Sequence, residues 1–134
     1  MSWIDLLDDP RSIRAVYGAH VPSLAGAVLH ELRLHRDGPQ VIFRIDLPEY
    51  PANPPEKWVT QGFTTVQLEL VLGGVQNVLV EGLSTDSVVD LELGRAGDHV
   101  RTTTSAGSSS VIDVRSRWVS VDRISAYQDT IPAS

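Results

Sequence analysis

The sequence predicts an α+β domain in which a short N-terminal helix precedes a predominantly antiparallel, meander-like β-sheet. Apolar residues recur at helical spacing near the start of the chain. After residue 26, about eight short runs alternate apolar and polar residues, with turn signals between them. The length of 134 residues fits a single domain over residues 1–134.

The predicted helix covers about residues 10–17. Asp9 is a good N-cap, Pro10 suits the first helical position, and Gly18 is a natural stop. The segment before Asp9 is expected to add a further helical turn that lays its apolar side on the core. The apolar face of the helix consists of Ile13, Val16 and Tyr17.

The first two predicted strands, residues 29–35 and 41–47, pair antiparallel through a turn at Asp37-Gly38-Pro39. His30 and His35 lie five residues apart in the first run. The odd separation in a strand places them on opposite faces, where they cannot share a metal ion.

The proline-rich residues 48–57 are predicted to form a loop, because proline lacks the backbone donor that a central strand needs. Gly73-Gly74 should form a tight turn, so that the strand after it pairs antiparallel with the strand before it. The remaining predicted strands are residues 65–72, 75–83, 89–93, 99–104, 110–117 and 119–124.

Composition excludes several classes of function. Acidic residues outnumber basic residues 17 to 11, for a formal charge of −6, so a nucleic-acid backbone would be repelled on average. Without cysteine there can be no disulfide, thiolate zinc site or cysteine nucleophile. No apolar run approaches the ~20 residues of a membrane span, and residues 1–9 lack a secretory signal pattern. We therefore expect a cytoplasmic protein that binds neither nucleic acid nor a membrane.

No local motif for catalysis or cofactor binding is present. The sequence contains no Gly-x-Ser-x-Gly elbow, no Ser-x-x-Lys, no phosphate loop and no dinucleotide fingerprint. The histidines are interpreted as solvated or hydrogen-bonded side chains. We predict no catalytic residue, no metal and no cofactor. An enzyme is the least favoured class, although residues far apart in sequence can still form an active site.

Several short motifs follow one another in a characteristic order over nearly the whole chain. They are Asp9-Pro10-Arg11-Ser12-Ile13 through Tyr17-Gly18, Val21-Pro22-Ser23-Leu24, Pro54-Pro55-Glu56-Lys57-Trp58 and Ile124-Ser125-Ala126-Tyr127. In this order they resemble the immunity protein 50 family of bacterial polymorphic toxin systems. The resemblance implies a small cytosolic, non-catalytic protein that binds and neutralises a cognate toxin domain.

The proline-rich loop is the predicted contact surface for such a toxin. Rigid aromatic side chains beside the loop can serve as interface anchors, and an acidic protein can be steered onto a basic toxin. For Trp58 the competing interpretation is that it covers one end of the core. The predicted toxin-binding residues are Glu49, Tyr50, Glu56 and Trp58.

Two alternatives from other function classes stay open. A small-molecule-binding module would form its pocket where the sheet curls against the N-terminal helix, and a ligand retained on purification would indicate it. A structural or self-associating module would use a sheet edge, for which residues 108–112 are the candidate, and a concentration-dependent oligomer would indicate it.

Overall fold

The computed structural model describes residues 2–82, 88–104 and 110–128. The 3-10 turn η1 (Trp3–Leu6) and the helix α1 (Arg11–Tyr17) begin the chain, and α2 (Glu56–Gln61) lies between the second and third strands. This order of elements confirms the predicted α+β class with its short N-terminal helix and antiparallel sheet. The strands are β1 (Ala25–His35), β2 (Gln40–Asp46), β3 (Thr65–Gly73), β4 (Asn77–Glu81), β5 (Val88–Ala96), β6 (His99–Thr104), β7 (Val111–Ser116) and β8 (Trp118–Tyr127).

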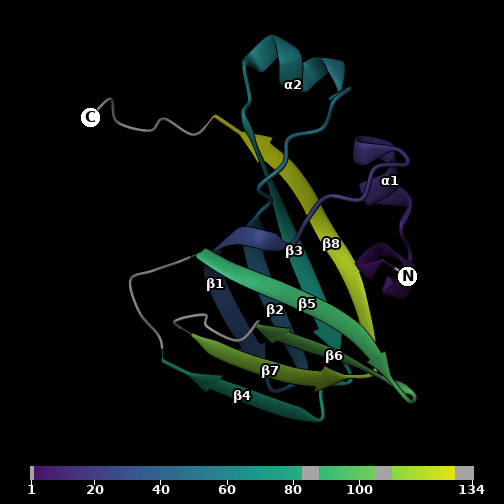
Figure 1. Cartoon of the computed structure of the whole chain (residues 1–134), viewed down its shortest axis with the longest axis vertical. Helices are drawn as coiled ribbons and strands as arrows, with labels where there is room; N and C mark the ends of the chain where they lie inside the picture. The colour runs from purple at the N-terminus through teal and green to yellow at the C-terminus, as the bar shows by residue number, and fades with distance from the viewer. Residues whose placement is uncertain (1, 83–87, 105–109, 129–134) are drawn as a thin grey trace.

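The eight strands form one antiparallel sheet in the order β4-β7-β6-β5-β1-β2-β3-β8. Strands β1 to β3 form one meander and β5 to β7 another. Strand β5 joins the two, because residues 88–90 pair with β1 and residues 91–96 pair with β6. In Figure 1 the half made of β5, β6, β7 and β4 crosses in front of the half made of β1, β2, β3 and β8.

Three predictions about strand pairing, the sheet edge and the proline-rich loop are wrong. Strand β4 pairs with β7 and not with β3, whose free side is taken along its whole length by β8. Strand β7 lies between β4 and β6, so Val111 and Ile112 are not at an edge, and residues 108 and 109 lie outside the described residues. The prolines predict a loop through residue 57, but a helix, α2, begins at Glu56. Alternation of apolar residues identifies a strand without identifying its neighbour.

The core lies between the two halves of the sheet and is closed by the N-terminal elements. Ile4 of η1 and Ile13 of α1 are fully buried, and each such side chain contributes about 1.5–3 kcal/mol on burial. None of the helices in the described ranges is long and apolar enough to cross a membrane. Alternate residues of β2 and β3 supply the centre of the core: Val41, Phe43, Ile45, Val66, Leu68, Leu70 and Leu72.

A β-bulge in β1 controls which of its residues face outwards. Leu29 pairs with Ile45 and Glu31 pairs with Arg44, so His30 is an extra residue between them. The bulge changes the parity of the strand and turns both His30 and His35 to the outer face of the sheet. The prediction that they lie on opposite faces is therefore wrong, because it assumed unbroken alternation.

The carboxylate of Asp46 lies on the outer face, yet the residue is only 5% exposed. Its Oδ2 lies 2.7 Å from His30 Nε2 and also accepts a hydrogen bond from the Tyr127 hydroxyl. Its Oδ1 accepts a hydrogen bond from Gln67 Nε2 at 3.0 Å. These partners belong to β1, β8 and β3, so one side chain of β2 joins four strands.

We predict that Asp46→Ala lowers the free energy of unfolding by about 2 kcal/mol or more, because it leaves three polar groups without their shared acceptor. Denaturant unfolding measures this change. Tyr127→Phe removes one of the hydrogen bonds and should cost about 1–2 kcal/mol. The matched control is Asp122→Ala in β8, an exposed position, with an expected change within about 0.5 kcal/mol. An Asp46 variant as stable as the Asp122 variant would contradict the prediction.

Gly73 and Trp118 lie opposite each other in β3 and β8. A Cβ atom at Gly73 would lie 1.9 Å from Cζ2 and 2.0 Å from Cε2 of the Trp118 indole. These separations are far inside the ~3.5–4.0 Å of a favourable carbon contact. Glycine is required at this position because the indole occupies the space of a side chain.

Gly73→Ala is therefore expected to lower the free energy of unfolding by about 1–3 kcal/mol, because the indole has to move. Thermal or denaturant unfolding measures the change. Gly94→Ala in β5 is the matched control, since nothing lies within 4 Å of the added Cβ. In a Trp118→Ala background most of the cost should disappear. An equal cost in both backgrounds would show that the indole is not its cause.

Candidate functional site

The proline-rich segment leaves the sheet at the end of β2 and returns at the start of β3. Residues 47–55 connect β2 to α2, and Gly62 ends α2 in the left-handed conformation (φ 69°, ψ 30°) that glycine adopts without strain. None of the residues of α2 is buried. Figure 1 shows α2 at one end of the molecule, beyond α1. The loop is thus presented at a protruding end.

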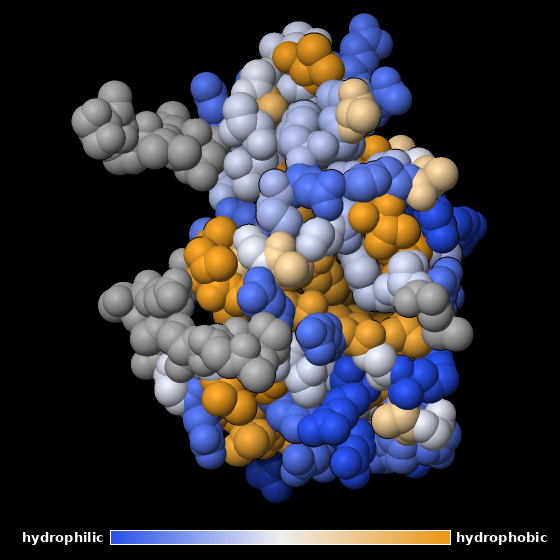
Figure 2. Space-filling model, viewed as in Figure 1, coloured by the Kyte–Doolittle hydropathy of each residue, from blue (hydrophilic) through white to orange (hydrophobic). Residues whose placement is uncertain are grey.

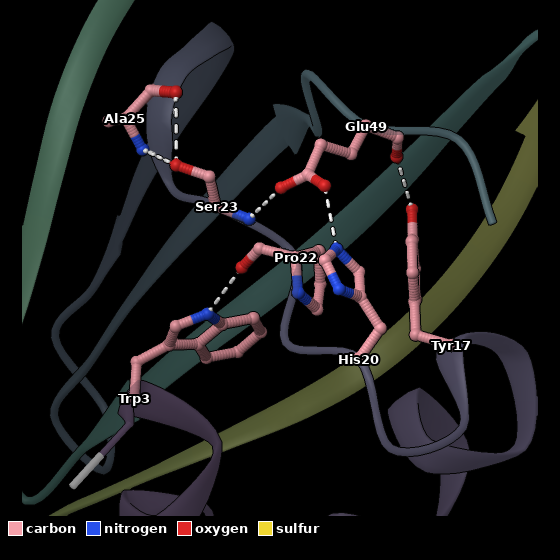
Figure 3. Close-up of polar contacts among 7 residues, drawn as sticks. All are labelled: Trp3, Tyr17, His20, Pro22, Ser23, Ala25 and Glu49. Carbon is pink, nitrogen blue, oxygen red and sulfur yellow. Dashed lines mark hydrogen bonds and ion pairs between the residues drawn. The ribbon is translucent and has the colours of Figure 1, made fainter. Parts of the chain in front are cut away.

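Glu49 fastens this loop to the linker between α1 and β1. Its Oε2 lies 2.6 Å from His20 Nε2, and its Oε1 accepts a hydrogen bond from the Ser23 N–H at 2.7 Å. Its backbone carbonyl accepts a hydrogen bond from the Tyr17 hydroxyl at 2.6 Å. Figure 3 shows these three contacts converging on Glu49 from α1 and the linker.

The linker is also held from its other side. Trp3 of η1 donates its indole N–H to the carbonyl of Pro22 at 2.8 Å (Figure 3). The Ser23 hydroxyl accepts a hydrogen bond from the Ala25 N–H at 3.0 Å at the start of β1. The linker that binds Glu49 is therefore itself held by hydrogen bonds, from Trp3 to Pro22 and from Ala25 to Ser23.

The electrostatics of the cluster follow from these contacts. The hydrogen bond from the Ser23 N–H, followed by the one from His20, lowers the pKa of Glu49 below its ordinary value of 4.5. Burial, with the nearby Glu49 and Tyr50, raises the pKa of the Tyr17 hydroxyl. Tyr17 therefore stays protonated and acts as a hydrogen-bond donor, while Glu49 stays ionised as an acceptor.

Tyr50 and Trp58 contact each other from the loop and from α2. Their ring centroids are 6.4 Å apart and the rings are tilted by 46°, within the range of favourable aromatic pairs. Both are half-buried and pack against the hydrophobic core. The Tyr50 hydroxyl is buried, and no described atom forms a hydrogen bond with it. Trp58 thus covers the end of the core while part of its ring faces solvent.

A cleft of about 490 Å³ opens between α1 and the loop, and we call it the His20–Glu49 cleft. Polar and apolar groups contribute to its walls, and the buried hydroxyl of Tyr50 belongs to one of its lining residues. Within the described ranges, no group of three or more His, Asp and Glu side chains is placed to hold a metal ion. The lining residues are Ala15, Val16, Tyr17, Gly18, His20, Glu49, Tyr50, Ala52 and Asn53.

The structure brings three of the four predicted contact residues together. Glu49 and Tyr50 line the cleft, and Trp58 packs on Tyr50. Glu56 is exposed in the first turn of α2 and does not line the cleft. Sequence reasoning missed the pairing of His20 with Glu49, since 29 residues separate them and no motif marks the contact. The interpretation of His20 as a hydrogen-bonded side chain is confirmed.

The fold and this site define a small antiparallel-sheet protein with a fixed, protruding loop surface. The chain belongs to the immunity protein 50 family, whose family model matches residues 9–127. The match confirms the resemblance carried by the sequence motifs and contains the cleft and all four predicted contact residues. No match to this chain is found among curated proteins or among solved structures.

The lowered pKa of Glu49 leads to a prediction about acid stability. A carboxylate with a lower pKa in the folded than in the unfolded chain stabilises the fold above the unfolded-state pKa, and this contribution is lost as pH falls through the native-state pKa. Glu49→Gln should therefore be less stable than the original chain near neutral pH, with a difference that shrinks below about pH 4.5. Denaturant unfolding over a pH series measures it. A difference independent of pH would contradict the prediction.

Proposed function

We propose that this chain is a non-catalytic immunity protein that binds a cognate toxin domain in the bacterial cytoplasm and blocks it. The family match over residues 9–127 is the observation that carries this proposal. Neutralisation by binding needs a stable scaffold and a complementary surface, and no reacting group. The antiparallel sheet with its fixed loop supplies such a scaffold.

We further propose that the protruding end formed by residues 48–61 is the toxin-contact surface, with Glu49, Tyr50, Glu56 and Trp58 as its contact residues. The contacts of Glu49 fix the loop before binding, and a preorganised loop loses little conformational entropy when it docks. Trp58 provides a partly exposed aromatic anchor. Beside it, Val59 is 61% exposed, and Figure 2 shows an apolar area over α2.

The acidic charge of the chain supports this proposal for a toxin with a basic surface. A formal charge of −6 attracts a basic partner over distances of about the Debye length, ~8 Å at physiological salt. Glu56 adds an exposed carboxylate on the proposed contact surface itself. Association should then be faster at low than at high ionic strength.

A second candidate function rests on the His20–Glu49 cleft. Its volume of about 490 Å³ lies in the range of small-molecule sites, and both polar and apolar residues line it. Native mass spectrometry of the purified chain distinguishes the two candidates, because a small-molecule-binding module should retain a ligand. A mass equal to that of the bare chain would favour the toxin-binding function.

The direct test is co-expression with the toxin domain encoded beside this chain. Growth should be restored, and the two proteins should purify together as a complex. A soluble, folded chain that neither restores growth nor forms a complex would contradict the proposal.

Two variants test the contact surface within the same assay. Trp58→Ala removes the aromatic anchor and should weaken toxin binding at least tenfold, by about 1.4 kcal/mol or more. Glu56→Lys should mainly slow association with a basic toxin. Leu34→Ala in β1 and Glu92→Lys in β5 are matched controls, since both residues are exposed and lie outside the loop. Binding unchanged by Trp58→Ala in a folded chain would remove this surface from the proposal.

A further inference from the structure

The two edges of the sheet differ in their protection. At the β8 edge, Leu7 forms a parallel bridge with Val119, and the Asp8 N–H donates to the Val119 carbonyl at 2.9 Å. At the other edge, β4 pairs with β7 on one side, and none of the described residues pairs with it on the other. The N-terminal segment therefore pairs with the β8 edge at Val119, while none of the described residues pairs with the free side of β4.

Strand β4 is short and ends in the charged Glu81, but it lacks several of the devices that commonly protect an exposed edge. Such edges carry proline, lysine or a bulge, each of which discourages pairing with another strand. The sequence of β4 is Asn-Val-Leu-Val-Glu, and its pairing with β7 runs without a register shift. Its geometry is that of a regular strand ready to pair.

The register of β4 and β7 shows which backbone groups point to the free side. The Ile112 N–H donates to Thr104 Oγ1 and therefore points towards β6. Alternation along an antiparallel ladder then turns the backbone groups of residues 111, 113 and 115 towards β4. Their partners are Glu81, Leu79 and Asn77. It follows that the N–H and C=O groups of Val78 and Val80 point to the free edge.

The side chains around this edge are apolar on both faces of the sheet. Val78 and Val80 pack against the core, while Leu79 on the outer face is 41% exposed. Val111 of β7 is diagonal to Leu79 on the same face and is 45% exposed. Two of the five large apolar side chains that are exposed in the described residues therefore lie on the edge strand β4 and on its neighbour β7.

We propose that β4 pairs with β4 of a second copy of this chain, in an antiparallel register centred on Leu79. This register is self-complementary. It places Val78 opposite Val80 of the partner, so that the free backbone groups of both strands meet as hydrogen-bonded pairs. Leu79 meets its own copy in a non-hydrogen-bonded pair, where side chains approach most closely.

The charges fit the same register. Glu81 lies opposite Asn77 of the second copy, whose amide can donate to the carboxylate, and no two like charges face each other in β4. The two-fold axis stands perpendicular to the sheet, so both inner faces stay on the same side. The result is a closed two-fold dimer with one continuous sheet, and each β8 edge keeps the bridge from Leu7 to Val119 of its own chain.

Sedimentation equilibrium of the full chain tests the proposal. The expected mass is twice the 14.6 kDa of one chain, with dissociation at low concentration. Hydrogen exchange should show the Val78 and Val80 amides protected at high concentration and exchanging at least tenfold faster at low concentration. A chain that stays monomeric throughout would overturn the proposal, as would protection of these amides only after a toxin domain is added.

Charge variants at the axis identify the interface. Leu79→Lys and Leu79→Glu each place two like charges opposite one another, so each variant alone should be monomeric. Mixing the two variants should restore the dimer, because the charges then have opposite signs. Val59→Lys in α2 is the control and should stay dimeric, and circular dichroism confirms that each variant is folded. If both Leu79 variants alone remain dimeric, or if the mixture stays monomeric, pairing through β4 is overturned.

Discussion

The hydrogen-bonded carboxylate of Asp46 is the interaction on which the longer half of the sheet depends. A carboxylate this deeply buried is costly unless donors surround it, and His30, Gln67 and Tyr127 supply them from three other strands. His30 faces Asp46 because of the bulge in β1, and the same bulge returns Leu32 to the inner face opposite Phe43. The single bulge in β1 thus lets His30 contact Asp46 on the outer face and places Leu32 on the inner face of the sheet.

The protruding loop inherits its position from this half of the sheet. It begins at Pro48, just after β2 ends at Asp46, and it is fastened again through Glu49 to the segment that precedes β1. Both ends of the loop therefore join strands whose relative positions Asp46 fixes. The other half is attached differently, since three residue pairs join β5 to β1 within the described part of the chain. A recognition surface on the loop is carried by the more firmly connected half.

Local sequence patterns predicted most helices and strands, but they did not predict contacts between residues far apart in the sequence. The stop at Gly18, the alternation in β2 and β3, and the turn at Gly38 each depend on neighbouring residues. The predicted N-cap at Asp9 is wrong, because α1 begins at Arg11 and Pro10 holds the N-cap position. The bulge at His30, the pairing of β4 with β7 and the contact of His20 with Glu49 depend on residues far apart in sequence. The prolines concealed α2, although Pro55 before Glu56 stands where a helix can begin. For the site, the pattern predicted the loop as a contact surface without revealing that Glu49 is engaged within the molecule.

The two proposed surfaces lie at opposite ends of the molecule. Figure 1 shows α2 at one end and β4 at the other, with the core between them. Figure 2 shows apolar residues gathered along β5, between the helical end and the lower half of the sheet. Neither surface includes a residue of the other, so pairing through β4 leaves the loop free in both copies. A dimer would carry two toxin-contact loops, one on each copy, and binding at one end does not require the other end to open.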